Sequence, residues 1–445
     1  MTIPPPTLPV RARPALVTLL AVSAFVAAAA RGADENIPSH RPSAAESAFA
    51  AERAQHLTEL GVDRWLAAGA SGRGAKVAIL DSGLRGYKDQ LGKALPAKVT
   101  TRSFRKDGNL EARDSQHGVL CGEVIHTLAP DAELLFANWE EDDAETFLKA
   151  VRWAREQGAQ IISCSVIMPS HSDGEGGGPV HRELARILGG GDRRGDVLLF
   201  ASAGNTAERH WAGRFHGNAD GFHEWRTGVV DNVVRPWGKE RVAVELCCKA
   251  GANYDVIVCD ADTGAEVTHS AAPVEAGSGS RAARFLPKAG RSYRVRVRLA
   301  GGEAGAFHVV ALQAGLGETT AAGSVAFPAD GAEVIAVGAV DHAGKRTSYS
   351  ACGSDSFKSK PDLVAPVPFA SAWRPRPFAG TSAAAPQAAA LAALVWSRNP
   401  DWTAERVRAT LRTSAKDLGP PGYDPETGFG MVRLPAAPEA RRGPK

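Results

Sequence analysis

The chain has 445 residues, enough for two or three domains and a large buried core. Hydrophobic residues make up 44% and charged residues 23%, which is typical of soluble globular proteins and excludes a wholly disordered chain. The 52 basic and 49 acidic residues leave a net charge of +3, without a concentrated basic block, so no nucleic-acid partner is expected.

The first thirty residues have the layout of a secretory signal peptide. Arg11 and Arg13 precede an uncharged run from Ala15 to Ala30 that ends in small residues. The run is shorter than the about 20 residues that a membrane-spanning helix needs. We therefore predict a signal peptide over 1–30, cleaved after Ala30, and a secreted or periplasmic protein without membrane association afterwards. A retained N-terminal anchor is the alternative.

After a polar, irregular stretch over 31–56, the chain alternates short apolar runs with amphipathic stretches. Nearly continuous apolar runs are expected of strands that are buried on both faces of a sheet. The alternation predicts an α/β fold with a doubly wound, mostly parallel sheet. The predicted strands are Lys76–Asp81, Glu133–Trp139, Ile161–Ile167 and Val197–Asn205, and the predicted helices between them are His117–Leu128 and Asp142–Gln157.

The periodicity changes to two between about residue 207 and residue 322. Val242, Val244 and Leu246 alternate with other side chains, and turn-forming clusters such as Asp260–Gly264 separate such runs. This pattern predicts antiparallel strands with one solvated face, which we interpret as an inserted β-sandwich domain. The first rhythm then resumes with strands at Glu333–Val340 and Pro361–Pro366, an Ala-rich helix to Trp396 and a last helix near Ala404–Ser414.

These changes of pattern suggest the organisation of the chain. We expect an α/β domain made of 57–206 and 323–434, with the β-sandwich domain, 207–322, inserted between its two parts. A linker over 31–56 precedes it, and a frayed Pro- and Arg-rich tail over 435–445 follows it.

Four polar residues stand where such a fold presents functional groups. Asp81 and Asn205 end apolar strands, His117 opens a helix, and Ser382 lies where a loop meets the Ala-rich helix. Ligands bind outside the carboxyl ends of parallel strands, so one edge of the sheet can bring the four together. Taken singly, each also fits a simpler interpretation, such as a strand cap or a surface turn.

The chemistry of a serine nucleophile requires this set of residues. A histidine accepts the proton of the hydroxyl, a carboxylate orients the histidine, and fixed donors hold the oxyanion. Ser382 is then the nucleophile, His117 the base and Asp81 its orienting group, while the Asn205 amide and the Ser382 N–H are the oxyanion donors. We place Pro386 in the first turn of its helix, where a missing N–H is tolerated.

The segments around these residues resemble the subtilisin-like serine proteases, or subtilases, and follow their chain order of Asp, His and Ser. The resemblance covers roughly 57–206 and 324–434 and extends to a bacterial secreted subgroup with an inserted β-sandwich. It implies a subtilisin-like fold, the triad Asp81, His117 and Ser382, Asn205 as oxyanion-hole amide, and protein or peptide substrates. The matching segments are GRGAKVAILDSG (72–83), DSQHGVLCGEVIHTLAPDAEL (114–134), FASAGN (200–205), SKPDLVAP (359–366) and GTSAAAPQAAALAAL (380–394).

The chain departs from the family pattern at two places. Val119-Leu120 replaces the usual Thr-His after the His-Gly pair, and Ser165-Val166-Ile167 replaces Ser-Leu-Gly on the strand that flanks the substrate cleft. The branched Ile167 bears on the breadth of accepted substrates and leaves the triad untouched. Most exported relatives also carry a folded inhibitory propeptide, and 31–56 is too short and irregular for one, so we expect none.

We therefore expect an exported serine endopeptidase that hydrolyses peptide bonds through an acyl-enzyme on Ser382 and acts as a monomer. The chemistry requires no cofactor. Asp255, Asp260 and Asp262 do not have EF-hand spacing, so a hairpin turn is favoured, and a structural calcium ion remains an unsupported option.

Two alternatives to this function remain open. One is a secreted binding protein that uses the β insert with the protease fold as scaffold, and the other is a narrowly selective processing activity.

Several further side chains have two interpretations each. The Cys121 thiol lies one helical turn from His117, either beneath the imidazole or as a small buried apolar group. In an exported protein, Cys259 can pair with Cys247 or Cys248. We interpret Glu123 and His126 as solvated or capping groups. A packed domain junction is favoured over an active-site rim for the cluster of His210, Trp211, His216, His223 and Trp225.

Overall fold

The computed structural model describes residues 44–270, 272–274, 278–354 and 360–439, with the backbone alone for 44–48. The predicted signal peptide (1–30), the beginning of the predicted linker and the end of the predicted tail lie outside the described residues. The signal peptide stays a prediction, which N-terminal sequencing of the mature protein tests. Among the described residues, no helix has the length and hydropathy needed to cross a membrane.

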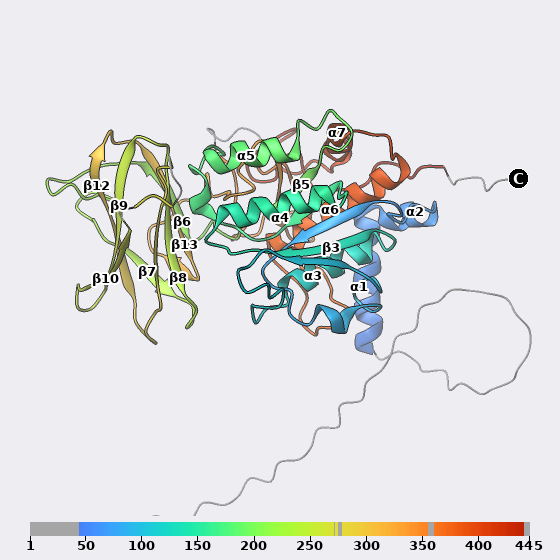
Figure 1. The fold of residues 1–445 in the computed structure, drawn as a ribbon, viewed down its shortest axis with the longest axis horizontal. Coiled ribbons are helices and arrows are strands. Elements are labelled where there is room, and N and C mark those ends of the chain that lie inside the picture. The colour runs from blue at the N-terminus through green and yellow to red at the C-terminus, as the bar shows by residue number, and fades with distance from the viewer. Residues whose placement is uncertain (1–43, 271, 275–277, 355–359, 440–445) are drawn as a thin grey trace, which may run out of the picture. The chain divides into compact units, whose positions relative to one another are not determined.

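A parallel sheet forms the centre of the α/β part (Figure 1). Its strands lie in the order β16-β15-β5-β4-β1-β3-β2, and every neighbouring pair is parallel. The prediction of a doubly wound parallel sheet is confirmed. The strands are β1 (Lys76–Leu80), β2 (Thr100–Ser103), β3 (Glu133–Asn138), β4 (Ile161–Cys164), β5 (Leu198–Ser202), β15 (Val334–Val340) and β16 (Leu363–Pro366).

Helices cover both faces of this sheet. Val77 and Ile79 of β1 pack into the same core as α3 and α6, whereas Ala78 and Leu80 pack into a second core with α4 and α5. Burial on both faces explains the continuous apolar runs of the sequence. The helices are α1 (Ala44–Leu60), α2 (Val62–Ala67), α3 (His117–Leu128), α4 (Ala144–Glu156), α5 (Pro179–Leu188), α6 (Thr381–Arg398) and α7 (Ala404–Ser414), with short 3-10 turns η1 (Tyr87–Gln90) and η2 (Pro169–His171).

The strands between β5 and β15 form two antiparallel sheets (Figure 1). One has the order β10-β9-β12-β7-β14 and the other β11-β8-β13-β6, and a shared core with Tyr254 and Phe307 lies between them. The predicted antiparallel insert is confirmed. Its strands are β6 (His210–Arg214), β7 (Asn232–Pro236), β8 (Val242–Cys247), β9 (Ala252–Asp260), β10 (Glu266–Ser270), β11 (Arg281–Phe285), β12 (Tyr293–Gly302), β13 (Ala306–Leu312) and β14 (Ala314–Leu316).

Buried hydrogen bonds join the insert to the segment that follows β4. Glu245 of β8 accepts a hydrogen bond from the backbone N–H of Ser170 at 2.9 Å. The hydroxyl of Ser280 donates to the carbonyl of Ser172 at 2.6 Å. Arg284 balances the charge of Glu245 at 2.9 Å. The insert therefore contacts the α/β part through specific polar groups.

The histidines and tryptophans after Asn205 divide between two places. Trp211, His223 and Trp225 contact one another edge to face within the sandwich, with ring centroids 4.8–5.0 Å apart. His210 instead bonds His308 at 3.0 Å, where both line a small cavity together with residues of the α/β part. The predicted packed junction therefore applies to His210, whereas both tryptophans belong to the core of the insert. Trp211 follows His210 on β6, so strand alternation directs it to the opposite side of the sheet.

All six cysteines are described, buried and free, so the disulfide considered from the sequence is absent. The thiol of Cys247 donates to the carbonyl of Pro169 at 3.0 Å, and that of Cys248 to the carbonyl of Gly279 at 3.2 Å. Cys259 lies on β9, in the other sheet of the sandwich. Cys259 therefore lies in a different sheet from Cys247, a separation that the strand pattern of the sequence did not reveal.

The predicted turn at Asp260–Gly264 connects β9 and β10. The carboxylate of Asp260 accepts hydrogen bonds from the backbone N–H groups of Asp262 at 3.1 Å and Thr263 at 3.0 Å. Arg291 pairs with Asp260 at 3.2 Å. This is the hydrogen-bond pattern of an Asx turn, which agrees with the hairpin interpretation.

Helix α1 contradicts the predicted irregular linker over residues 44–56. This stretch is rich in Ala and Glu, which are strong helix formers. His56 bonds Gln387 of α6 at 2.8 Å, and Arg53 bonds Thr127 of α3 at 2.8 Å. These partners lie far away in sequence, so the local pattern did not reveal that the stretch is anchored.

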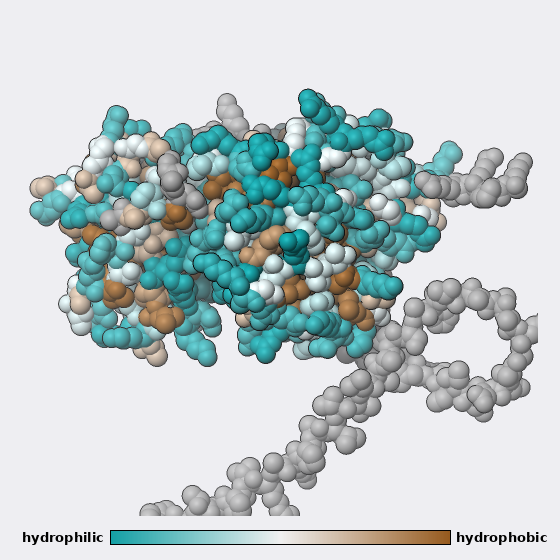
Figure 2. Space-filling model, viewed as in Figure 1, coloured by the Kyte–Doolittle hydropathy of each residue, from teal (hydrophilic) through white to brown (hydrophobic). Residues whose placement is uncertain are grey.

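The surface is a mixture of polar and small apolar areas. Figure 2 shows one face on which hydrophilic residues predominate, with small hydrophobic patches between them. Among the described residues, the large hydrophobic side chains classed as exposed are Trp237, Val267 and Leu286, all in the insert.

A buried histidine of α5, His181, lies between two carboxylates. His181 bonds Asp330 at 2.9 Å and Glu333 at 2.7 Å and is only 3% exposed. Burial lowers the pKa of His181, but the two carboxylates outweigh burial and raise that pKa to about 10. The histidine is therefore charged in the folded protein at neutral pH, and its charge stabilises the fold.

We expect His181→Gln to lower the free energy of unfolding by about 3 kcal/mol at pH 6, because two buried carboxylates lose their counter-charge. The contribution of His181 is fully present below its unfolded pKa of about 6.5. It is lost as the pH rises through about 10, so the difference from the parent shrinks over that range. Urea denaturation at a series of pH values measures this difference.

His269→Gln is the matched control, because His269 pairs with Glu266 at the same distance of 2.7 Å but is 57% exposed. The control should change stability little at any pH. A loss for His181→Gln that does not depend on pH between 6 and 10 contradicts the assignment of charge.

Candidate active site

The order of the strands brings three of the relevant segments to one edge of the sheet. β5, β4 and β1 are neighbours and run parallel, so their carboxyl ends meet at the same edge. Asp81 directly follows β1, Ser165 directly follows β4, and Asn205 comes three residues after β5. This edge is where open parallel sheets bind ligands.

Asp81 and His117 form a hydrogen-bonded pair at this edge. The Nδ1 atom of His117 lies 2.7 Å from Oδ2 of Asp81, whose other oxygen accepts from the backbone N–H of Gly83 at 2.8 Å. Asp81 is fully buried, whereas the side chain of His117 is 31% exposed. A carboxylate only accepts, so Nδ1 carries the proton and Nε2 is left as an acceptor that faces solvent or a ligand.

A glycine after the histidine makes this close approach possible. A Cβ atom on Gly118 would lie 2.7 Å from the Cβ of Asp81 and 2.7 Å from Leu84. The backbone N–H of Gly118 donates to the carbonyl of Gly83 at 2.7 Å. The start of α3 therefore packs directly on the turn after β1, which the sequence showed only as a His-Gly pair.

The surroundings of His117 tune its proton affinity. Burial lowers the pKa of His117, but the charge of Asp81 and its hydrogen bond outweigh burial and raise the pKa above its usual value. The ring of Phe378 contacts the imidazole edge to face, with centroids 5.5 Å apart. At a pH above this pKa, His117 is a neutral base. At a pH below it, His117 is an imidazolium that Asp81 stabilises.

Ser382 lies in the first turn of α6, beside the segment after β4. Its Oγ donates to the carbonyl of Ser165 at 3.4 Å, and the Ser165 hydroxyl donates back to the carbonyl of Ser382 at 3.2 Å. Within the described residues, Ser382 and His117 do not share a hydrogen bond. The sequence predicts that His117 accepts the proton of Ser382, but of the bonds within the predicted triad only the one between Asp81 and His117 is formed in this structure.

Pro386 leaves the carbonyl of Ser382 free for these contacts. α6 begins at Thr381, so Pro386 is in the second turn and not in the first turn as predicted. A proline has no N–H to donate to the carbonyl four residues earlier, which is that of Ser382. That carbonyl instead accepts from Ser165 and from the thiol of Cys121 at 3.7 Å.

Asn205 is fixed by its side-chain oxygen. Oδ1 accepts from the backbone N–H of Thr381 at 3.0 Å and from the Thr381 hydroxyl at 2.9 Å. Because the N–H and the hydroxyl of Thr381 both donate, the amide atom that they contact is assigned as the oxygen. Nδ2 then keeps two hydrogens to donate. Gly380 has φ 84°, and a Cβ there would lie 2.8 Å from Nδ2, so a glycine keeps this space open.

The thiol of Cys121 lies beneath this group of residues. Its Sγ is 3.9 Å from Oδ2 of Asp81 and 3.7 Å from the carbonyl of Ser382. Ligand atoms of Asp81, His117 and Cys121 all lie within 4.8 Å of one another, the spacing of a metal site. Burial and the neighbouring Asp81 raise the pKa of Cys121 well above its usual value, so the thiol is protonated in this site at neutral pH.

Glu123 is buried and not solvated, contrary to the prediction. It is 2% exposed, and its carboxylate accepts from the Ser371 hydroxyl at 2.8 Å and from the Trp373 indole at 3.0 Å, besides an ion pair with Arg53 at 3.3 Å. These donors offset the cost of burying a charge. Glu123 thereby ties α3 to the segment that leads to Phe378.

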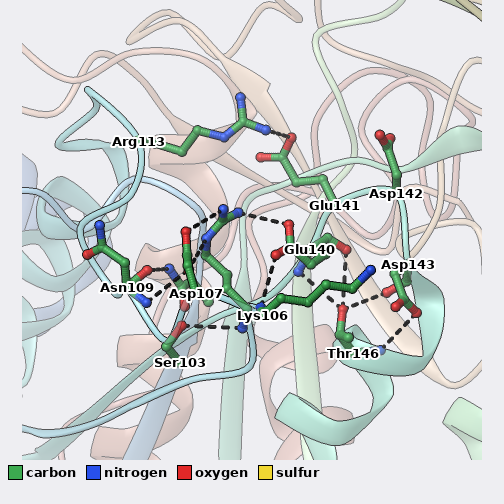
Figure 3. Close-up of polar contacts among 12 residues, drawn as sticks. Ser103, Lys106, Asp107, Asn109, Arg113, Glu140, Glu141, Asp142, Asp143 and Thr146 are labelled. Atoms are coloured by element: carbon green, nitrogen blue, oxygen red, sulfur yellow. Dashed lines mark hydrogen bonds and ion pairs between the residues drawn. The ribbon is translucent and has the colours of Figure 1, made fainter.

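A polar network supports the loop that enters α3 (Figure 3). Glu140 accepts from the backbone of Lys106 at 3.1 Å and pairs with Arg105 at 3.0 Å. Arg113 pairs with Glu141, and Asp143 caps α4 through the backbone N–H groups of Glu145 and Thr146. The network lies on the loops at the carboxyl ends of β2 and β3, close in sequence to His117.

The four residues singled out from the sequence therefore stand at or next to one edge of the sheet. Asp81 and His117 are bonded, Asn205 is held by the residue before Ser382, and Ser382 is joined to both Ser165 and Cys121. Sequence reasoning missed the contacts of Ser165, Phe378 and Glu123, since nothing local to these residues indicates their distant partners.

Comparison with known proteins identifies the family. The sequence model of the Subtilase family matches residues 72–227 and 279–430, which together are most of the chain. The interruption between the two matched stretches falls within the antiparallel insert.

Individual relatives match shorter stretches. Subtilisin of Bacillus pumilus is 37% identical over 134 residues, which is 29% of this chain and 46% of that protein. Subtilisin Savinase of Lederbergia lenta is 38% identical over 120 residues, 26% of this chain and 42% of that protein. The alignments thus span less than half of the length of either relative.

A solved structure extends the likeness of the fold. The CspB protease of Clostridium perfringens superposes with a TM-score of 0.61, covering 85% of this chain and 96% of that chain at 16% sequence identity. This likeness concerns the fold, and the match to the family model over most of its length shows that the chain belongs to the subtilase family.

Proposed function

We propose that this subtilase is an exported serine endopeptidase that hydrolyses peptide bonds through an acyl-enzyme on Ser382. The observation that carries the proposal is the hydrogen bond of 2.7 Å between a buried Asp81 and the first residue of α3, His117. A partly exposed imidazole that is oriented by a buried carboxylate can act as the base for a serine nucleophile. Family membership supports the same reading.

In the proposed reaction, Oγ of Ser382 attacks the carbonyl carbon of the scissile bond, and its proton passes to Nε2 of His117. The protonated imidazole then gives this proton to the leaving amine as the C–N bond breaks. Water then attacks the acyl carbon and passes a proton to Nε2 of His117, which returns a proton to Oγ of Ser382 as the ester bond breaks and the carboxylic acid leaves. Asp81 holds Nδ1 and stabilises the imidazolium. The absent Ser382–His117 bond is compatible with this, since such bonds often form only when substrate is bound.

Two donors are available for the oxyanion of the tetrahedral intermediate. Nδ2 of Asn205 has no partner among the described residues, because Thr381 occupies only Oδ1. The N–H of Ser382 belongs to the first turn of α6 and has no acceptor inside the helix. The positive end of the helix macrodipole at this point favours negative charge.

The segment after β4 supports binding of an extended peptide. In the described part of the chain, the backbone N–H and carbonyl of Ile167 have no backbone partner. An extended substrate can add to such a free edge as a strand. The side chain of Ile167 is half-buried and lies beside Gly204. Its Cγ2 atom would be 3.7 Å from a Cβ atom placed on Gly204, so Ile167 narrows the space next to Asn205. We propose protein or peptide substrates, with selectivity for a small residue at this point.

Export, and chemistry that requires no cofactor, are proposed on sequence grounds. The charged and apolar segments of residues 1–30 support export, and the chemistry described above needs no metal ion or organic cofactor.

We expect a fluorophosphonate to label the parent protein at Ser382 and to leave Ser382→Ala unlabelled, because only an activated hydroxyl attacks such a reagent. Mass spectrometry of the labelled peptide gives the modified residue. Ser165→Ala, which removes the hydroxyl next to Ser382, should still be labelled. A folded parent that is not labelled at all favours the alternative of a binding protein with a protease scaffold.

We expect Asn205→Ala to lower kcat by about 10²–10³ with little change in KM, since it removes one oxyanion donor. Steady-state hydrolysis of a peptide substrate measures both constants. Thermal unfolding checks that the variant is folded. An unchanged kcat in a folded variant rules out this role of Asn205.

We expect kcat/KM to rise with pH as His117 loses its proton, with an apparent pKa above the usual 6.5. Asp81→Asn should lower kcat by roughly 10⁴. It should also move the apparent pKa below that of the parent, because burial then acts without the opposing charge. The pH profile of kcat/KM with one peptide shows both effects. An apparent pKa in Asp81→Asn equal to or higher than that of the parent contradicts the proposed pairing.

A further inference from the structure

Arg209 stands where the chain leaves the sheet edge and enters the insert. Its Nε donates to the backbone carbonyl of Asn205 at 2.8 Å. Its own N–H donates to the carbonyl of Thr206 at 2.9 Å, which closes a tight turn around this contact. The guanidinium thus reaches back to the residue that we propose as an oxyanion donor.

The other side of Arg209 is held by the insert. The backbone N–H of Ala311 in β13 donates to the carbonyl of Arg209 at 3.0 Å, and Nη1 of Arg209 donates to the carbonyl of Ala311 at 3.4 Å. The guanidinium lies over the ring of Trp237, 5.0 Å from its centroid. The backbone N–H of Trp237 in turn donates to the carbonyl of Gln313 at 3.1 Å.

In the described part of the chain, the contacts of the Arg209 guanidinium are backbone carbonyls and an aromatic ring, and no carboxylate is among them. Burial lowers the pKa of Arg209 to about 10, so the side chain stays protonated at neutral pH. Partly buried cations are costly unless they are paired. Here the charge is instead met by two backbone carbonyls, those of Asn205 and Ala311, and by the face of Trp237. These contacts hold the guanidinium in place between the insert and Asn205.

Asn205 is therefore held from both ends. Thr381 fixes the side-chain oxygen, Arg209 fixes the backbone carbonyl, and Nδ2 has no partner among the described residues. An oxyanion donor is effective only when its position is set before the charge develops. A shift of about 1 Å at such a position can cost 10²-fold in rate.

We propose that Arg209 is a positioning residue that couples the inserted sandwich to the oxyanion donor Asn205. The inference rests on the proposed function of Asn205. It assigns the insert a part in the reaction: β13 and Trp237 support Arg209, Arg209 sets the backbone of Asn205, and Asn205 holds the oxyanion.

We expect Arg209→Gln to lower kcat roughly 10- to 100-fold and to change KM by less than about twofold. Arg209→Lys keeps the charge but not the forked geometry, so it should fall between Gln and the parent. Arg296→Gln is the matched control. Arg296 is also half-buried in the insert, pairs with Asp231 and lies 5.9 Å from the ring centroid of Phe222, but it has no contact with the site. This control should keep the parental kcat.

A double-mutant cycle tests whether Arg209 acts through Asn205. If it does, Arg209→Gln has little further effect on kcat in the Asn205→Ala background. Additive losses overturn the proposal. Trp237→Ala removes only the support from the insert and should lower kcat in the same direction by less. It serves as the second variant if Arg209→Gln does not fold.

Hydrogen exchange of the segment 203–206, followed by mass spectrometry, provides a readout that does not depend on activity. Arg209→Gln should speed exchange there, and Arg296→Gln should not. Unchanged exchange in Arg209→Gln overturns the positioning role whatever the activity. If Arg209→Gln speeds exchange but the parent protein neither hydrolyses peptides nor is labelled at Ser382, the positioning role is supported and the proposed function is overturned.

Discussion

The structure of the site depends on one buried charge, the carboxylate of Asp81. Burial by itself lowers the pKa of His117, and only the nearby negative charge and hydrogen bond reverse this effect. The contact requires that α3 begins against the turn after β1, which a side chain at Gly118 would prevent. The same helix carries Cys121 beneath the imidazole and Glu123, whose donors hold the segment that brings Phe378 to the ring.

The serine side of the site follows from two features of α6. Its first turn supplies N–H groups without helical acceptors, and Pro386 removes the donor that the carbonyl of Ser382 would otherwise use. That carbonyl then binds Ser165 at the end of β4. A proline in the second turn thus fastens the helix to the central strand, at the cost of one helical hydrogen bond.

The insert is joined to the α/β part by contacts on both segments that flank the sheet edge. Glu245 binds the backbone of Ser170 after β4, and Arg209 binds the backbone of Asn205 after β5. Both are polar side chains in largely buried settings, where each hydrogen bond is strong because water competes little. The sandwich is therefore connected to the segments after β4 and β5 by specific side-chain contacts as well as by the covalent chain.

The sequence by itself determined the elements whose signals are local. Apolar runs identified the parallel strands, the His-Gly pair marked the beginning of α3, and the bounds of α7 were predicted without error. Period-two alternation identified the antiparallel insert. Only the tertiary structure decided that Ala44–Leu60 is an anchored helix, that Glu123 is buried, that Cys247 and Cys259 lie apart, and that Arg209 reaches Asn205. The reason is physical: periodicity reports which way a side chain faces within its own element. The partner it meets depends on how elements separated by tens or hundreds of residues pack together.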